Sequence, residues 1–398
     1  MARFFRNNRF HKGEEGESFL KLFVSKRLLH GAATSLLTIF LPIFLYEVSG
    51  GLFLIVGSYY AALSLIYVLL LSPMMQVINK IGFSHALVVS GGLSVLMNLV
   101  LYFLSPENFQ ALIVPLLFVT ALFTIFHWVP FHVDFTLFSS KEARGKQIGL
   151  TMATIAFMGV VGPILAGFII ANAGYQALFG VVIVLTLAAT VSYALVPETR
   201  TKFTWSVKKT WREFFDRKYR PVIAGEFASG AEIVIDRVVW PIFLFEILRG
   251  NVLEIGAVST FVVAVAIVVQ LFMGNYLDVH KNSKERTLKV GSSLYAVGWI
   301  LKMFVLSALH VFFVGLYHNI VRIFTRTPYN KMLYDISADQ GRYMDEFTVL
   351  REMANHLGRA GCLTIVAFMS IFISIEWTFI IAAIASIALN FIYYHHHQ

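Results

Sequence analysis

Long apolar runs, separated by short polar segments, recur from one end of the chain to the other. Each run has about 20 residues, the length that an α-helix needs to cross the hydrocarbon of a bilayer. The runs are apolar on nearly all sides instead of alternating, which favours helices over the strands of a membrane barrel. We expect twelve spans, at residues 20–47, 51–78, 84–105, 110–138, 147–172, 175–196, 221–248, 252–277, 288–308, 310–334, 346–373 and 375–394.

Composition supports a membrane protein surrounded by lipid. Hydrophobic residues make up 58% of the 398 positions and charged residues only 14%, far from the balance of a soluble domain. The net charge of +9 comes from basic residues in the short segments between apolar runs, so no nucleic-acid partner is expected. The single cysteine, Cys362, excludes an internal disulfide, and neither a metal nor another cofactor is expected.

The distribution of charge predicts how the chain crosses the membrane. Basic residues precede span one and follow spans two, four, six and eight, whereas the opposite loops carry Glu47, Glu107, Glu246, Arg249 and Glu376. Because positive residues concentrate on the inner side, both termini are expected in the cytoplasm of a multi-pass protein of the cell membrane. No short apolar segment with a cleavage site precedes span one, so no cleaved signal peptide is expected.

The second half of the chain repeats the first after 199 positions. Pro42-Ile-Phe-Leu-Tyr-Glu47 matches Pro241-Ile-Phe-Leu-Phe-Glu246, and Gly31-Ala32 matches Gly230-Ala231. Six spans separate the copies, an even number, so the repeats are parallel. The sequence therefore predicts an all-α protein of two parallel six-helix bundles, at 1–196 and 221–398. The linker at 197–220, with Trp205 and Trp211 among basic residues, predicts a helix on the inner membrane surface.

Several segments resemble the major facilitator superfamily. In span five, Gly159-Val-Val-Gly162-Pro163-Ile-Leu-Ala166-Gly167 is similar to the family's glycine–proline motif, in which small residues let helices approach closely. The family's loop pattern Gly-x-x-x-Asp-Arg-x-Gly is represented after span eight by Gly274 and Asp278. After span two, the positions of the pattern's Gly, Asp, Arg and Gly hold Met75, Asn79, Lys80 and Gly82. The resemblance implies two bundles that alternate around a cavity lined by spans one, four, seven and ten.

Span seven carries ionisable residues where they are most costly. Glu232 and Asp236 are four residues apart on one helical face, with Arg237 beside them. Repulsion and desolvation are expected to raise the proton affinity of one carboxyl, as proton coupling requires. A structural ion pair with an arginine of span ten is the alternative that the sequence leaves open.

Other polar side chains in the spans are candidates to bind substrate or to form ion pairs. They are Arg237, His318, Arg322, Arg326, His127, His132, Asp134 and Trp240. For each histidine, a hydrogen-bonded packing role is the competing interpretation. Lys302 is expected to extend toward a water-filled or interfacial region, outside the site.

These features predict a monomeric secondary transporter of a small molecule, working by alternating access and coupled to protons. No phosphate-binding loop of the Gly-x-x-x-x-Gly-Lys-Ser/Thr type occurs, and no catalytic set is expected. The glycine–proline motif resembles that of exporters, so export is favoured over uptake. The alternatives are a non-transporting sensor or assembly subunit of the same fold and, with less support, a membrane-embedded enzyme.

Overall fold

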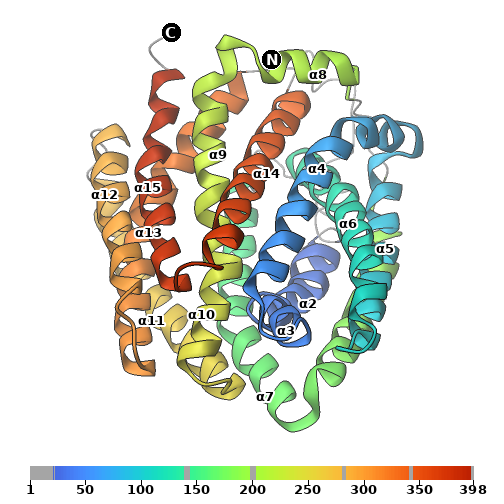
Figure 1. The fold of residues 1–398 in the computed structure, drawn as a ribbon. Helices are drawn as coiled ribbons and strands as arrows, with labels where there is room; N and C mark the ends of the chain where they lie inside the picture. Colours follow the sequence, from blue (N-terminus) through green and yellow to red (C-terminus); the bar gives the residue numbers. More distant parts are fainter. Residues whose placement is uncertain are drawn as a thin grey trace.

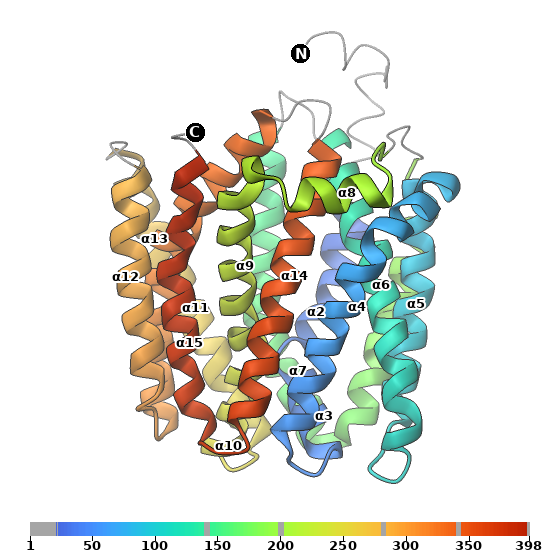
Figure 2. The ribbon, with the colours of Figure 1, turned by 45° about the horizontal axis from the view of Figure 1, so that its top comes forward.

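The computed structural model describes residue 21 and residues 23–138, 144–197, 203–279, 284–339 and 344–395. Within these ranges every regular element is a helix. Figures 1 and 2 show the helices crossing the molecule between its two ends, the first half of the chain on one side and the second half on the other. This confirms the predicted all-α fold of two six-helix bundles.

The first half begins with a bent span. A π-helical turn, η2 (Phe23–Leu29), leads into α2 (His30–Leu37) and α3 (Phe40–Val48), whose axes differ by 48°. Three further spans follow, α4 (Phe53–Ile81), α5 (Phe83–Phe103) and α6 (Phe109–Phe138). The long helix α7 (Arg144–Tyr193) holds spans five and six, because Gly174 has φ 77° and ψ 175° and reverses the chain there.

The second half starts with the linker helix α8 (Val207–Phe214) and a short turn, η3 (Arg217–Tyr219). Span seven consists of α9 (Arg220–Val234), the π-helical η4 (Ile235–Val239) and α10 (Trp240–Ile247). The remaining spans are α11 (Val252–Val279), α12 (Lys284–Lys302), α13 (Ala308–Asp339), α14 (Met344–Met369) and the last one, formed by η6 (Ile375–Thr378), α15 (Phe379–Ala388) and η7 (Leu389–His395).

Length and apolar composition alone identify seven of the described helices as able to cross a membrane, or eight with the bent pair α2–α3. The other crossings have physical reasons for escaping that test. α7 contains two spans, span seven is interrupted by η4, and α12 and α14 carry several charged residues. About a dozen spans are therefore consistent with the structure.

Both copies of the repeat break span one and its equivalent at the same place. The break between α2 and α3 is at Thr38, and η4 contains Arg237, 199 positions later. A proline lies four residues beyond each, Pro42 and Pro241. Because proline has no N–H, it cannot donate to the carbonyl four residues earlier, and the helix loosens at that carbonyl. The repeated prolines thus account for the break in each half.

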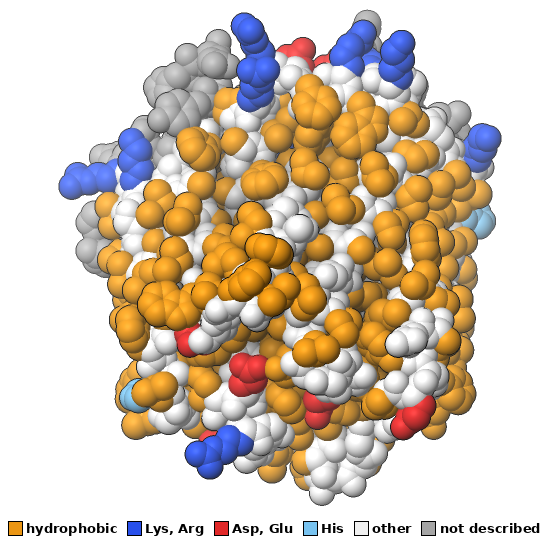
Figure 3. Space-filling model, viewed as in Figure 1, with side chains coloured by type: hydrophobic (Ala, Val, Ile, Leu, Met, Phe, Trp, Pro, Cys, Tyr) orange, Lys and Arg blue, Asp and Glu red, His pale blue; other side chains and the backbone are white. Residues whose placement is uncertain are grey.

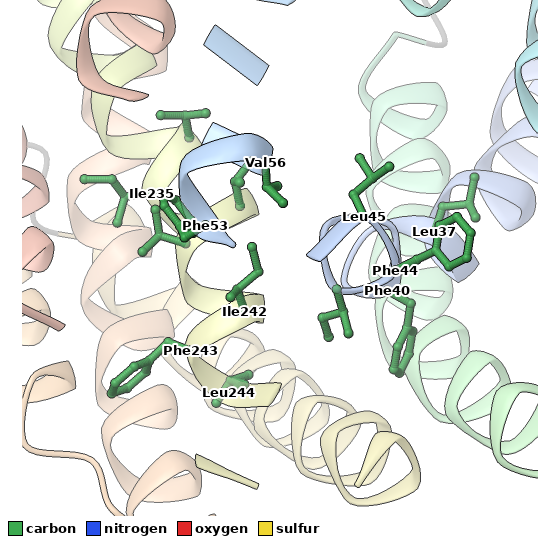
Figure 4. Packing of buried hydrophobic residues seen from close by; sticks show 14 of the residues in the cluster. Leu37, Phe40, Phe44, Leu45, Phe53, Val56, Ile235, Ile242, Phe243 and Leu244 are labelled. Carbon is green, nitrogen blue, oxygen red and sulfur yellow. The ribbon is translucent and has the colours of Figure 1, made fainter. Parts of the chain in front are cut away.

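A large apolar cluster joins the halves at the end of the molecule where α3 and α10 lie. Figure 4 shows Phe44 and Leu45 of α3 and, from the equivalent segment of α10, Phe243 and Leu244. Just beyond them Tyr46 donates a hydrogen bond to Glu246 across the two halves, at 2.6 Å. The matched segments of the repeat therefore meet each other and seal this end.

The linker ties the halves together at the opposite end. The side chain of Asn79, at the end of α4, donates to the carbonyl of Phe203 (2.6 Å) and accepts from its N–H (3.0 Å). Thr204 donates twice to Glu346 at the start of α14, through its N–H and its hydroxyl. Trp205 is buried, at 3% exposed. The predicted linker helix is present as α8, but the segment before it packs between α4 and α14 instead of lying only on the membrane surface.

The surface has an apolar belt between two polar ends. Exposed leucine, phenylalanine, isoleucine and valine side chains cover the outer faces of the helices, and Figure 3 shows them across the middle of one face. Most of the lysine and arginine on that face lies at the upper edge, near α8, and most of the acidic side chains lie toward the lower end. We call these the basic end and the acidic end. This pattern is that of a multi-pass membrane protein.

Candidate functional site

The charged side chains of span seven lie at its break. Glu232 is in the last turn of α9, and Asp236 and Arg237 are in η4. The wider π-helical turn displaces the side chains that follow it, which is one reason such turns recur at functional sites. The break thus determines where these charges point.

Glu232 is enclosed and fully bonded. Its side chain is 1% exposed, and one oxygen accepts a hydrogen bond from the Tyr295 hydroxyl of α12 at 2.6 Å. The other oxygen forms an ion pair with Arg326 of α13, which also donates to the hydroxyl of Ser229 at 2.7 Å. Glu232 therefore joins three spans through one buried carboxylate.

Asp236 is shared by two cations and is partly open to solvent. Its two oxygens lie 3.2 Å from the Lys302 ammonium and 3.4 Å from the Arg322 guanidinium. The exposed fractions of the side chains are 22% for Asp236, 38% for Arg322 and 2% for Lys302. One cation is thus a buried, fixed partner, and the other faces accessible space.

The expectation that Lys302 lies outside the site is wrong. Its ammonium also lies 4.3 Å from the centre of the Trp240 ring and 4.0 Å from that of Trp299. Two aromatic faces and a carboxylate stabilise the buried charge more than an extended path to the interface would. Trp240, a candidate of the sequence analysis, covers this lysine from α10.

His318 lies beside this network on α13. Its ring packs 4.5 Å from Tyr295 and 4.6 Å from Trp299 between centroids, and it is 2% exposed. Neither ring nitrogen has a hydrogen-bond partner among the described residues. A Cβ on Gly298 would lie 2.9 Å from its Nδ1, so the glycine makes room for the ring.

A third carboxylate completes the polar interior of the second half. Glu226 of α9 accepts from the Tyr329 hydroxyl at 3.1 Å and from the Asn355 amide at 3.3 Å, and lies 3.7 Å from Arg351. Three carboxylates of span seven are therefore held by spans nine, ten and eleven.

The first half has a pair of histidines at the corresponding place. His30 and His127 lie 4.4 Å apart between ring centroids, and the Ser90 hydroxyl is 3.3 Å from a nitrogen of His127. In the second half Ser229, 199 positions after His30, contacts Arg326, which lies within one residue of the repeat position of His127. The repeat thus preserves a contact between spans one and four and between spans seven and ten, but with different chemistry.

Four predicted site residues fall on side chains that the structure does not describe. The backbones of His132 and Asp134 are in α6, and those of Gly274 and Asp278 are in α11. The described site therefore consists of Glu232, Asp236, Arg237, Trp240, His318, Arg322 and Arg326, to which the structure adds Lys302, Tyr295 and Glu226.

The glycine–proline motif lies on two helix contacts. A Cβ on Gly162 would lie 2.6 Å from the side chain of Ser35, within the first half. A Cβ on Gly167 would lie 2.6 Å from the carbonyl of Val252, and one on Gly256 would lie 2.4 Å from the carbonyl of Pro163. Gly159 faces Val263 at 3.6 Å. Gly159, Pro163 and Gly167 of α7, together with Gly256 of α11, thus lie at the crossing of these two helices, where the two halves meet.

Comparison with known proteins agrees with this architecture. The family model of the Major Facilitator Superfamily matches residues 27–344. A Bacillus subtilis (strain 168) protein, the uncharacterized YqgE, is 23% identical over 242 residues, which are 59% of this chain; the match spans only 56% of that relative's length.

The fold is also similar to that of a solved transporter. A crystal structure of a point variant of the E. coli fucose:proton symporter FucP superposes with a TM-score of 0.62 and 13% identity, covering 95% of this chain and 98% of FucP. Such low identity bears on the fold alone. Together with the family match over most of the sequence, it shows that the chain is a member of the Major Facilitator Superfamily, whose members are secondary transporters and not enzymes.

Proposed function

We propose that the chain moves a small solute across the cell membrane by alternating access, coupled to protons through Asp236 and Glu232. The observation that most supports coupling is the position of Asp236, between the buried Lys302 and the half-exposed Arg322. A carboxylate held by two cations stays ionised, and it takes up a proton once those cations move away. A change in this one contact therefore links helix movement to proton binding.

The break in span seven supplies the movement. α10 lies beyond the break, and its last turn is bonded to the first half by the pair Tyr46 and Glu246. When the halves separate at the acidic end, this bond is lost and α10 is released to shift relative to α9, and the chain yields where its hydrogen bonding is already loosened, at η4. Asp236 lies in η4, so its distances to the cations of α12 and α13 change in the same step.

Glu232 is proposed as the second proton-binding group because it is tied to the same break. It reaches solvent less than Asp236 does, at 1% exposed, and depends on Arg326 for its charge balance. A proton is therefore expected to exchange first at Asp236 and at Glu232 only in a state where Arg326 has moved.

Orientation and direction follow from charge and from the span-five motif. We propose that the basic end faces the cytoplasm, since lysine and arginine concentrate on the inner side of a membrane. Phe23 belongs to one small apolar cluster with Val196, and Ile392 lies 3.4 Å from a Cβ built on Gly225 in the first turns of α9, so both ends of the described chain lie at the basic end. Export is the proposed direction, on the resemblance of the Gly159–Gly167 segment to exporters, and a monomer is the proposed working unit.

The decisive experiment measures proton movement in proteoliposomes with a pH-sensitive dye inside, while cationic, anionic and neutral solutes are added outside. Wild type is compared with Asp236→Asn and Glu232→Gln, and with Glu107→Gln, which removes an exposed carboxylate of the acidic end. Both directions of an imposed pH gradient are tested, because this shows whether the solute leaves with or against the protons.

We expect solute-triggered proton flux in wild type and Glu107→Gln, with at least a tenfold loss in Asp236→Asn. Exchange of labelled solute without a gradient should persist in the variant, because it needs the substrate site but no net proton transfer. Unchanged proton flux would assign Asp236 to structure. The absence of flux with every solute would favour the non-transporting alternative. One observation supports that alternative: Asn79 stands where the family's loop has an aspartate, and it hydrogen-bonds Phe203 of the linker.

A further inference from the structure

The charges around the break do not balance. Arg237 follows Asp236 in η4, and its side chain is exposed. It is close enough to Arg322, and to Arg359 on α14, for their positive charges to repel its own. Asp236 is already bonded to Lys302 and Arg322. Among the described side chains Arg237 has no ion pair or hydrogen bond of its own. One carboxylate thus faces three cations.

An uncompensated cation in a span is costly, so it requires water, a partner or a function. Arg359 does not relieve the imbalance, because it is itself a cation and lies near its own carboxylate, Glu352. The two surplus positive charges therefore belong to Arg237 and to whichever cation Asp236 does not neutralise. Their natural complement is an anion that enters from the accessible side.

The first half shows that the surplus is no requirement of the fold. The positions 199 residues before Asp236, Arg237 and Lys302 hold Leu37, Thr38 and Phe103, and the position 198 residues before Arg322, in the register of Pro130 and Pro328, holds Thr124, so all four are uncharged. Span one breaks at this position without these cations. A break there therefore does not by itself require them.

We propose that Arg237 and Arg322 bind the transported substrate, a small organic anion, through its carboxylate or phosphate oxygens. The proposal rests on the transport function proposed above and names its substrate class. Two guanidinium groups on neighbouring spans present planar forks that match such oxygens in pairs. Arg322 contacts Asp236 at 3.4 Å with one nitrogen only, which leaves its other donors for a ligand. Lys302 stays with Asp236 beneath them, held by Trp240 and Trp299.

Binding is tested on the purified full-length protein in detergent, at constant ionic strength and without any gradient. The probes are benzoate with its uncharged and cationic counterparts, benzamide and benzylamine, and glycerol 3-phosphate with glycerol. The first set tests a carboxylate and the second a phosphate. The readout is the shift in melting temperature with probe concentration, which yields an apparent Kd.

The variants are Arg237→Gln, Arg237→Lys and the matched control Arg220→Gln, which removes an exposed arginine from the start of the same span. We expect an anion to stabilise wild type and Arg220→Gln alike, at least tenfold weaker binding in Arg237→Gln, and an intermediate loss in Arg237→Lys, which keeps the charge without the fork. Because Arg237 is exposed, its substitution should leave the unliganded melting temperature within a few degrees of wild type.

Several results would overturn the proposal. They are equal binding of the uncharged or cationic counterparts, full anion binding by Arg237→Gln, and an equal loss in Arg220→Gln. A fourth is no shift in melting temperature with either anion at about 10 mM, a concentration above the KM range of roughly 1 μM–1 mM that is typical of small-molecule sites. Proton flux triggered by a neutral solute in the liposome assay would refute this inference while leaving proton-coupled transport intact. Anion binding without flux would do the reverse.

Discussion

The crossing of α7 and α11 leaves no room for a methyl group at Gly256. A Cβ there would lie 2.4 Å from the carbonyl oxygen of Pro163, 3.1 Å from its carbonyl carbon and 3.3 Å from the Cα of Ile164. All three are backbone atoms, so no side-chain rotation relieves the contact. A carbon and a carbonyl oxygen approach to about 3.3 Å, so Gly256→Ala must push the two helices apart by roughly 1 Å.

The expected cost is about 1–3 kcal/mol, as for other overpacked sites. It falls on the packing of small residues that holds membrane helices together in the absence of a hydrophobic driving force. Gly92→Ala is the matched control, because Gly92 is an exposed helical glycine with nothing within 4 Å of an added Cβ. Gly167→Ala tests the same crossing from the other side, where the carbonyl of Val252 is 2.6 Å away.

Thermal unfolding of the three variants in detergent measures the effect. Gly256→Ala and Gly167→Ala should melt below wild type, and Gly92→Ala should melt at or slightly above it, since alanine favours a helix over glycine. The transport rate should fall in the same two variants, because this crossing joins the halves that must move. If Gly256→Ala melts together with Gly92→Ala, the helices do not approach this closely and the argument fails.

Three further predictions concern the polar contacts. Lys302→Met should destabilise the protein by about 3–5 kcal/mol by leaving Asp236 without its buried partner, and adding Asp236→Asn should restore most of the melting temperature. Tyr46→Phe should weaken the contact between the halves at the acidic end by about 1 kcal/mol, because it removes the hydrogen bond to Glu246. The single cysteine, Cys362, is buried in the same apolar cluster, so its labelling by maleimide should become roughly fivefold faster. Asn79→Ala should speed amide hydrogen exchange at Phe203, whose N–H it holds, while exchange in the helix cores stays unchanged.

The sequence was sufficient to predict the spans and the repeat because both depend on local properties. Apolar length sets each crossing, and the copied segments Pro42–Glu47 and Pro241–Glu246 mark the two halves. The break in span seven escaped prediction, although its signal was present. Pro241 removes the hydrogen bond to the carbonyl of Arg237, and the same relation between Pro42 and Thr38 supports that interpretation twice.

The site was predicted in part, for a different reason. Isolated charges in an apolar run are conspicuous, so Glu232, Asp236 and Arg322 were found without a structure. Lys302 and Tyr295 were not, because a lysine near the end of a span and a tyrosine within one have ordinary roles at an interface or toward lipid. Only the packing of α12 against α13 and α15 directs them toward span seven, and a single sequence contains no direct record of which spans are neighbours.

The contrast between the halves bears on which gradient drives the proposed transport. Both halves break their first span at the same place, yet only the second half has cations at the break. A transported anion that carries one charge outward gains about 2.3 kcal/mol per 100 mV of an inside-negative potential. Export of an organic anion is therefore favoured by the membrane potential itself, and protons that enter in exchange add to the same driving force. The proposed anion site at Arg237 and Arg322 and the proposed export are therefore both consistent with a membrane potential that drives anions outward.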